Sequence, residues 1–202
     1  MNPMTVIRGP LALIERDNVD TDAIIPAIHT QEITTRLASG LFGNWRYRPD
    51  GSENPDFVLN RAPWNKAVAL VSCANFGCGS SREQAPWALK DFGIRAIFAA
   101  SFGDIFAANC LKNGILAWVL PDGALAMLRE VAEDPARCEI LIDIPADLVS
   151  AGDRRITLNL PDTIRNKLVS GKDDIEIVLD RSDAISEFQA QDRARRPWVW
   201  NA

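Results

Sequence analysis

The chain has 202 residues, of which 47% are hydrophobic, so it can bury one substantial core. A formal net charge of −5 without a basic stripe excludes a protein that binds nucleic acid through clustered lysines and arginines. No apolar run approaches the roughly 20 residues that span a membrane, and the N-terminus lacks a signal-peptide pattern. We therefore expect a single cytoplasmic domain over residues 1–202, with no membrane and no nucleic-acid partner.

The cysteines and the histidine do not follow a metal-ligand pattern. Cys73, Cys78, Cys110 and Cys138 contain no C-x-x-C pair, and His29 is the one histidine of the chain. We expect free thiols in a reducing compartment and no metal or iron–sulfur cluster held by this chain alone. Cys78 lies between two glycines and is placed to touch a ligand, although we favour a role as a small loop-filling residue.

The first elements are a strand and a polar turn. Residues 4–13 contain alternating apolar positions, which predicts a strand, and the aspartate-rich segment 17–22 interrupts the pattern. The aspartates do not match an EF-hand, because no glycine follows at the required position. Asp20, Thr21 and Asp22 are therefore either turn and cap residues or the hydrogen-bonding rim of a site.

A long irregular segment follows. Residues 30–55 mix arginines, tryptophan and small residues and end in a polar stretch at 49–55. Because loops of that length inside a compact domain are usually functional or mobile, we predict a flap-like loop around 30–55.

The candidate site lies in the loop NFGCGSSRE at residues 75–83, directly after an apolar strand predicted at 67–73. Gly79 lets the backbone approach a ligand closely, and Ser80, Ser81 and Arg82 offer donors to a carboxylate or phosphate. The motifs for ATP and for dinucleotides are excluded, since the required lysine and third glycine are missing. The structural alternative is a helix-capping serine next to an ordinary surface ion pair.

The sequence allows two positions for the start of the next helix. Ser80 and Glu83 have the spacing of a capping box, which predicts a helix that begins at the loop. Pro86 favours a start near Ala85 instead, because proline suits the first turn of a helix and disrupts its interior.

The rest of the chain alternates strands and helices, which predicts an α/β fold with a mixed sheet and flanking helices. The predicted helices cover residues 87–92, 102–112, 122–132, 162–169 and 184–191, with a tail from about 192. The predicted strands cover residues 94–100, 115–120, 139–144, 155–160 and 175–179.

Three blocks resemble one family. DNVDTDAIIPA at 17–27, NFGCGSSRE at 75–83 and ASFGDIF at 100–106 resemble the small subunits of 3-isopropylmalate dehydratase, which belong with aconitase. The resemblance implies a swivelling β/β/α domain made as a separate polypeptide. It also implies a hydro-lyase of leucine biosynthesis that interconverts 2- and 3-isopropylmalate through isopropylmaleate. The expected partner is a large subunit that carries a 4Fe-4S cluster.

The resemblance also implies roles for individual residues. Ser80 matches the catalytic base, and Arg82 matches a clamp for a substrate carboxylate. The Gly79 backbone and Ser81 help to form the anion pocket. Arg36 lies on the predicted flap, where the substrate's distinguishing side chain is recognised. Asp20, Thr21, Asp22 and Cys78 are supporting residues.

The chain departs from the family pattern at some positions, and these keep other functions open. Gln84 and Ala117 stand where the small subunits usually have histidine and proline, and the segment 170–179 also deviates. The alternatives are a paralogue for another 2-hydroxy diacid, of methylmalate, citraconate or homoaconitate type, or a non-catalytic dicarboxylate-binding or assembly module. A subunit interface also predicts exposed aromatic residues, with candidates Trp45, Trp64, Trp87, Trp198 and Trp200.

Overall fold

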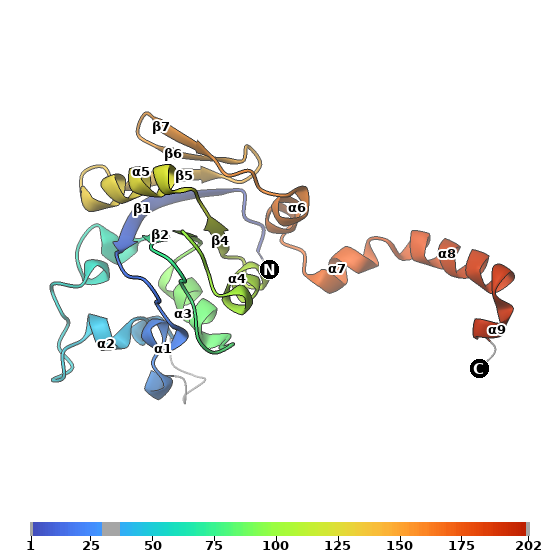
Figure 1. Cartoon of the computed structure of the whole chain (residues 1–202), viewed down its shortest axis with the longest axis horizontal. Helices are drawn as coiled ribbons and strands as arrows, with labels where there is room; N and C mark the ends of the chain where they lie inside the picture. The colour runs from blue at the N-terminus through green and yellow to red at the C-terminus, as the bar shows by residue number, and fades with distance from the viewer. Residues whose placement is uncertain (1, 30–36, 201–202) are drawn as a thin grey trace.

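The structure is a computed structural model that describes residues 2–29 and 37–200. Its centre is a seven-stranded mixed sheet with the strand order β4-β3-β2-β1-β5-β6-β7 (Figure 1). The strands are β1 (Val6–Ile14), β2 (Ala69–Ser72), β3 (Ala96–Ala99), β4 (Leu116–Val119), β5 (Glu139–Asp143), β6 (Leu148–Ala151) and β7 (Arg154–Thr157). The first four strands are parallel and the last three are antiparallel, so β1 joins two different half-sheets.

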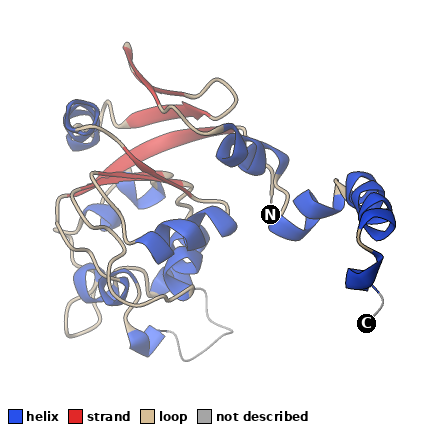
Figure 2. Cartoon of the chain, turned by 45° about the vertical axis from the view of Figure 1, so that its right-hand side comes forward, coloured by secondary structure: helices blue, strands red, loops and turns tan. Residues whose placement is uncertain are grey.

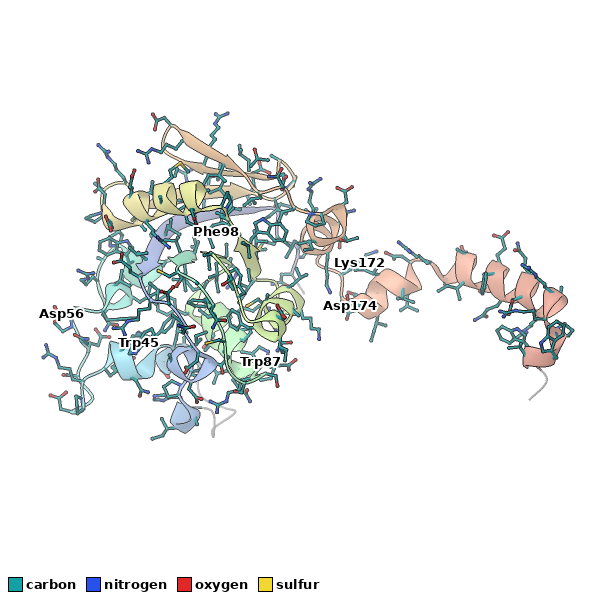
Figure 3. All side chains as sticks on the ribbon, in the orientation of Figure 1. Trp45, Asp56, Trp87, Phe98, Lys172 and Asp174 are labelled. Carbon is teal, nitrogen blue, oxygen red and sulfur yellow. The ribbon has the colours of Figure 1, made fainter. Side chains whose placement is uncertain are left out.

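The central strands β2 and β3 of the parallel half are buried on both faces. β2 and β3 consist of consecutive buried residues, which is typical of parallel strands covered by helices on each side. Successive side chains point to opposite faces, so Leu70 joins one hydrophobic core and Val71 the other. Phe98, labelled in Figure 3, lies in the second core.

The two cores are covered by different helices. Figure 2 shows helices on both sides of the sheet. The first core receives α1 (Thr21–Ile24), α3 (Gln84–Phe92) and α4 (Asp104–Lys112). The second receives α5 (Asp122–Glu133) and α6 (Asp162–Ser170). The α/β fold with a mixed sheet and flanking helices is confirmed.

Residues 37–46 of the predicted flap pack into the body, whereas residues 48–53 are exposed. The packed segment contains η2 (Leu37–Ser39) and α2 (Gly43–Arg46), and α1 is followed by η1 (Ala27–His29). Leu41 and Phe42 are fully buried, and the Phe42 ring stacks on Trp45 at 5.4 Å between centroids. Residues 37–46 are thus short helices anchored in the core. Beyond them, η3 (Val58–Asn60) and η4 (Trp64–Lys66) lead into β2.

The C-terminal residues form an arm that extends away from the body (Figures 1 and 2). The arm comprises α7 (Asp174–Leu179), α8 (Ser182–Arg195) and α9 (Pro197–Trp200). The predicted helix 184–191 is the middle of α8, and the residues expected as a tail from 192 are the end of α8 and α9. Within residues 2–29 and 37–200, no helix is long and apolar enough to cross a membrane.

In the C-terminal half one predicted strand was wrong and one strand was not predicted. The apolar run 175–179 is helix α7 and not a strand, because the Asp173 side chain caps it and Glu176 completes a capping box with bonds of 2.8 Å. Strand β6 was missed, since its four residues LVSA carry little pattern. It forms as one arm of a hairpin with β7, in which Gly152 adopts a φ of +61°.

Candidate active site

The three sequence blocks meet at the carboxyl ends of three parallel strands. Residues 15–20 follow β1, residues 73–83 follow β2 and residues 100–103 follow β3. The carboxyl edge of a parallel sheet is the usual position of a ligand site in open α/β folds. Segments that are about 60 and 80 residues apart in the chain therefore form one surface.

The first two loops are joined by backbone hydrogen bonds. The amide of Gly77 donates to the carbonyl of Val19 at 2.6 Å, and the amide of Thr21 donates to the carbonyl of Cys78 at 3.0 Å. The side chains of Asn75 and Asn18, both with left-handed backbones, meet at 2.8 Å. These contacts fix the aspartate-rich block against the glycine-rich block.

Gly77 holds the second loop against α4 in a way that no other residue can. Its φ is +74°, and a Cβ placed on it would overlap the ring of Phe106. A Cβ on Gly103, in the third loop, would lie only 2.6 Å from the Gly77 carbonyl oxygen. Close backbone packing between these loops therefore explains the two glycines.

Ser80 lies on the exposed rim of the loop and is backed by a buried hydroxyl. Its Oγ is 3.2 Å from Oγ1 of Thr21, and Thr21 Oγ1 is also 3.3 Å from the Ser80 carbonyl oxygen. Thr21 is only 1% exposed, so its hydroxyl points from the protein interior toward the serine. The preceding Gly79 has a φ of +92°, which turns the chain outward at this point.

Arg82 forms an ion pair with Asp22. Nη1 of Arg82 contacts Oδ1 of Asp22, and the two side chains are 32% and 60% exposed. A guanidinium has five N–H donors, so those that do not meet Asp22 can bind a ligand. Asp20 has a different role, since its Oδ1 accepts the amide of Ala23 at 2.6 Å and caps α1.

The structure decides between the two predicted helix starts. α3 begins at Gln84, its N-cap is Glu83, and no side chain caps it. The start near Ala85 is therefore confirmed and the capping box of Ser80 was wrong, because Pro86 fits the first turn of the helix. As a consequence, the Ser80 hydroxyl is not used as a cap of α3.

The other predicted site residues take different positions. Ser81 is exposed beside Ser80, and Cys78 is partly exposed within the loop. Arg36 lies outside the described residues. Sequence reasoning missed Ser101, whose Oγ accepts the amide of Asn75 at 2.8 Å and supports the start of the loop. The signal was present, since Ser101 belongs to the third block.

The described residues do not fit a metal centre or an iron–sulfur cluster. Among them, no three side chains of His, Cys, Asp or Glu lie close enough to hold a metal ion. Cys110 and Cys138 are buried, and Cys73 and Cys78 are partly exposed, all as free thiols. Burial raises the pKa of the Cys110 thiol, which makes the thiolate ligand form unfavourable.

Of the five tryptophans considered for an interface, Trp64 is buried and Trp45 packs against the first core. Trp87, Trp198 and Trp200 are exposed, and Figure 3 labels Trp87 on α3.

Fold and site together define an α/β domain with an exposed serine and a partly exposed arginine at the carboxyl edge of its parallel strands. Comparison with known proteins identifies the family within this class of α/β domains. The family model of the aconitase C-terminal domain matches residues 1–123. A crystal structure titled 3-isopropylmalate dehydratase, from Methanocaldococcus jannaschii, superimposes with a TM-score of 0.62 at 24% identity. It covers 90% of this chain and 98% of that one, which supports the fold.

Two curated relatives carry the same description, 3-isopropylmalate dehydratase small subunit. The protein from Xanthobacter autotrophicus is 44% identical over 98% of this chain and 100% of its own length. The protein from Staphylococcus haemolyticus is 41% identical over 96% of this chain and 98% of its own. The chain therefore belongs to the family of 3-isopropylmalate dehydratase small subunits, and the family expected from the three blocks is confirmed.

Proposed function

We propose that this chain is the small subunit of a heteromeric hydro-lyase that interconverts 2- and 3-isopropylmalate through isopropylmaleate in leucine biosynthesis. The observation that carries the proposal is the exposed Ser80 hydroxyl, which is backed by Thr21 at 3.2 Å and lies two residues from Arg82. This arrangement supplies a proton acceptor and a carboxylate binder on one rim.

Ser80 acts as the base. Dehydration of a hydroxy diacid breaks a C–H and a C–O bond, forms a C=C bond and releases water, so a group must accept the carbon-bound proton. A serine alkoxide needs donors that stabilise it. The Thr21 hydroxyl has one proton and two acceptors within 3.3 Å, the carbonyl and the Oγ of Ser80. It donates to the carbonyl while Ser80 is protonated and to Oγ when Ser80 loses its proton.

Arg82 binds a carboxylate of the substrate. Asp22 contacts Nη1 of the guanidinium and orients it, which leaves the remaining N–H groups to bind the carboxylate. The Gly79 backbone and Ser81 complete the anion pocket. Asp20 caps α1, and the Cys78 carbonyl accepts the amide of Thr21 and so joins the two loops. Arg36 remains the candidate for contact with the side chain that distinguishes the substrate.

The 4Fe-4S cluster belongs to the large subunit in this proposal, because the described residues of the small subunit do not fit its ligands. When bound, a cluster with an open iron supplies a Lewis acid for the substrate hydroxyl. The small subunit would contribute the base and the carboxylate binder.

Co-purification of the chain with its large subunit and anaerobic reconstitution tests the proposal. The complex is assayed with the hydroxy acids 2-isopropylmalate, citramalate and homocitrate, for which formation of the unsaturated acid is followed by absorbance. It is also assayed with the unsaturated acids citraconate and homoaconitate, for which the loss of absorbance on addition of water is followed. Activity with isopropylmalate above all others is expected. Activity confined to another acid would replace the substrate, and a cluster-loaded complex that turns over none of them would favour the assembly module.

A further inference from the structure

The arm of residues 172–200 carries more apolar surface than a free chain needs. Within it Asp192 alone is buried, whereas Ile175, Leu179, Phe188 and Trp198 are each more than 60% exposed. A helix rich in aliphatic residues, such as α7 with DIEIVL, is ordinarily stable only when it is covered. The exposed apolar side chains of the arm are therefore suited to pack against the surface of a partner.

Polar contacts hold the root of the arm in place without burying its apolar side chains. Lys167 of α6 pairs with Asp174, and Lys172 pairs with Asp180 at 2.5 Å. Figure 3 labels Lys172 and Asp174 at the root of the arm. The capping box of Asp173 fixes the first turn of α7. These contacts orient the helix while its apolar side chains remain accessible.

The tip of the arm is also organised in advance. Asp192 accepts hydrogen bonds from Nε of Arg196 at 2.7 Å and from Nε1 of Trp200 at 3.0 Å, and Arg193 lies over the Trp200 ring. α9 is thereby folded against the end of α8. Trp198, which is 73% exposed, projects from this fixed turn as a rigid anchor.

An apolar groove lies between the site and the helix from which the arm extends. The groove, of about 560 Å³, lies between edge strand β4, α4 and α6 and is lined by Phe102, Ala108, Leu111, Trp118, Val119 and Ile164, among others. Phe102 belongs to the third site loop, which pairs with Phe76 of the second. Ile164 belongs to α6, which leads directly into the arm. The groove thus lies between the third site loop and the helix that leads into the arm.

We propose that the arm and the apolar groove form one docking surface for the large subunit, with the arm as a clasp. The inference rests on the proposed function, which requires that a large subunit cover the site edge. A partner seated on that edge continues over the groove and reaches the arm. A second copy of this chain in the same place would cover the site loops and exclude the large subunit, so we reject it as the occupant.

The charges of the arm specify the chemistry of the partner surface. Residues 173–187 contain six carboxylates, of which Asp174 and Asp180 are paired with Lys167 and Lys172, and one arginine. Residues 193–196 contain three arginines, of which Arg196 is paired with Asp192. The matching face of the large subunit is therefore apolar along its centre, basic beside α7 and the start of α8, and acidic beside the tip. Such complementarity sets orientation and association rate more than affinity.

The test is a titration of the cluster-loaded large subunit with the full-length chain, read as activity. The variant Phe188→Ser/Trp198→Ser removes two exposed anchors, and Gln189→Ser, at the neighbouring exposed position, is the matched control. We expect the double variant and the groove variant Ala108→Glu to raise the half-saturating concentration about tenfold or more, with the plateau rate unchanged. The control should match the wild type.

Other outcomes would overturn the inference in distinguishable ways. Equal half-saturation for all variants, in an active complex, would refute the clasp and leave the proposed function standing. A lower plateau at unchanged half-saturation would show that the arm acts on turnover and not on docking. A dimer of the small subunit alone, lost in the double variant by sedimentation velocity, would make a second copy the occupant. A wild type that never binds the large subunit would refute both proposals.

Discussion

The Thr21 hydroxyl oxygen lies 3.2 Å from the Ser80 hydroxyl oxygen and joins the start of α1 to the loop after β2. Thr21 is buried and Ser80 is exposed, so the contact connects the interior to the rim of the site. Because the two residues are separated by 59 positions, the contact exists only in the folded chain. In the proposed mechanism, this contact lets the Thr21 hydroxyl donate to Ser80 when the serine has lost its proton.

Thr21→Val keeps the shape of the side chain and removes this donor. We expect kcat to fall about 10²-fold with little change in KM, because the donor acts on the deprotonated serine. Thr21→Ser should restore most of the rate. Steady-state kinetics of the reconstituted complex measure both values, and an unchanged kcat in the valine variant would exclude the assigned role.

Asp22→Asn removes the carboxylate that orients Arg82. We expect KM for the diacid to rise about threefold to tenfold, because the guanidinium loses its fixed direction while keeping its charge. Arg82→Lys should have a larger effect, since an ammonium lacks the planar fork. The ranking is checked by kcat/KM for each variant, and a larger loss for Asp22→Asn than for Arg82→Lys would contradict it.

Gly77→Ala tests the packing beneath the site. The new Cβ would overlap the Phe106 ring and would force a side chain into a positive φ, so we expect a loss of at least about 1–3 kcal/mol in the free energy of unfolding. Gly51→Ala is the control, because Gly51 has a φ of +82° and nothing within 4 Å of a new Cβ. Urea denaturation should show the smaller loss for Gly51→Ala. Equal losses would mean that the overlap has no effect.

The tip of the arm should depend on pH through Asp192. Hydrogen bonds from Arg196 and then Trp200 hold the pKa of Asp192 below its usual value. Its stabilisation is therefore complete above the ordinary aspartate pKa of about 4 and is lost as the pH falls through the lower, folded value. The indole N–H resonance of Trp200 should shift over that acid range, and Asp192→Asn should abolish the shift. A resonance that stays constant in the wild type would contradict the contact.

The sequence was sufficient for the elements with strong local patterns. β2, β3 and the helices that follow them were predicted because apolar runs and Gly93 or Asn113-Gly114 mark their limits. The site loop was found because its glycines, serines and arginine lie within a few positions. Those features depend on neighbours in the chain.

The elements and side-chain contacts that were not predicted depend on tertiary contacts that no local sequence pattern encodes. Residues 175–179 have the composition of a strand, yet the capping box at Asp173 makes them a helix. β6 forms because β5 and β7 provide partners on both sides. The pairing of Asp22 with Arg82, across 60 positions, and the support of Asn75 by Ser101 follow from the parallel order of β1, β2 and β3.

The rate of isopropylmaleate formation by the reconstituted complex, compared between wild type and Ser80→Ala, tests the central claim most directly. We expect kcat to fall at least about 10²-fold to 10⁴-fold, with KM and binding to the large subunit nearly unchanged, because only the proton acceptor is lost. A Ser80→Ala complex that keeps the wild-type kcat would show that another group takes the proton, and would contradict the account.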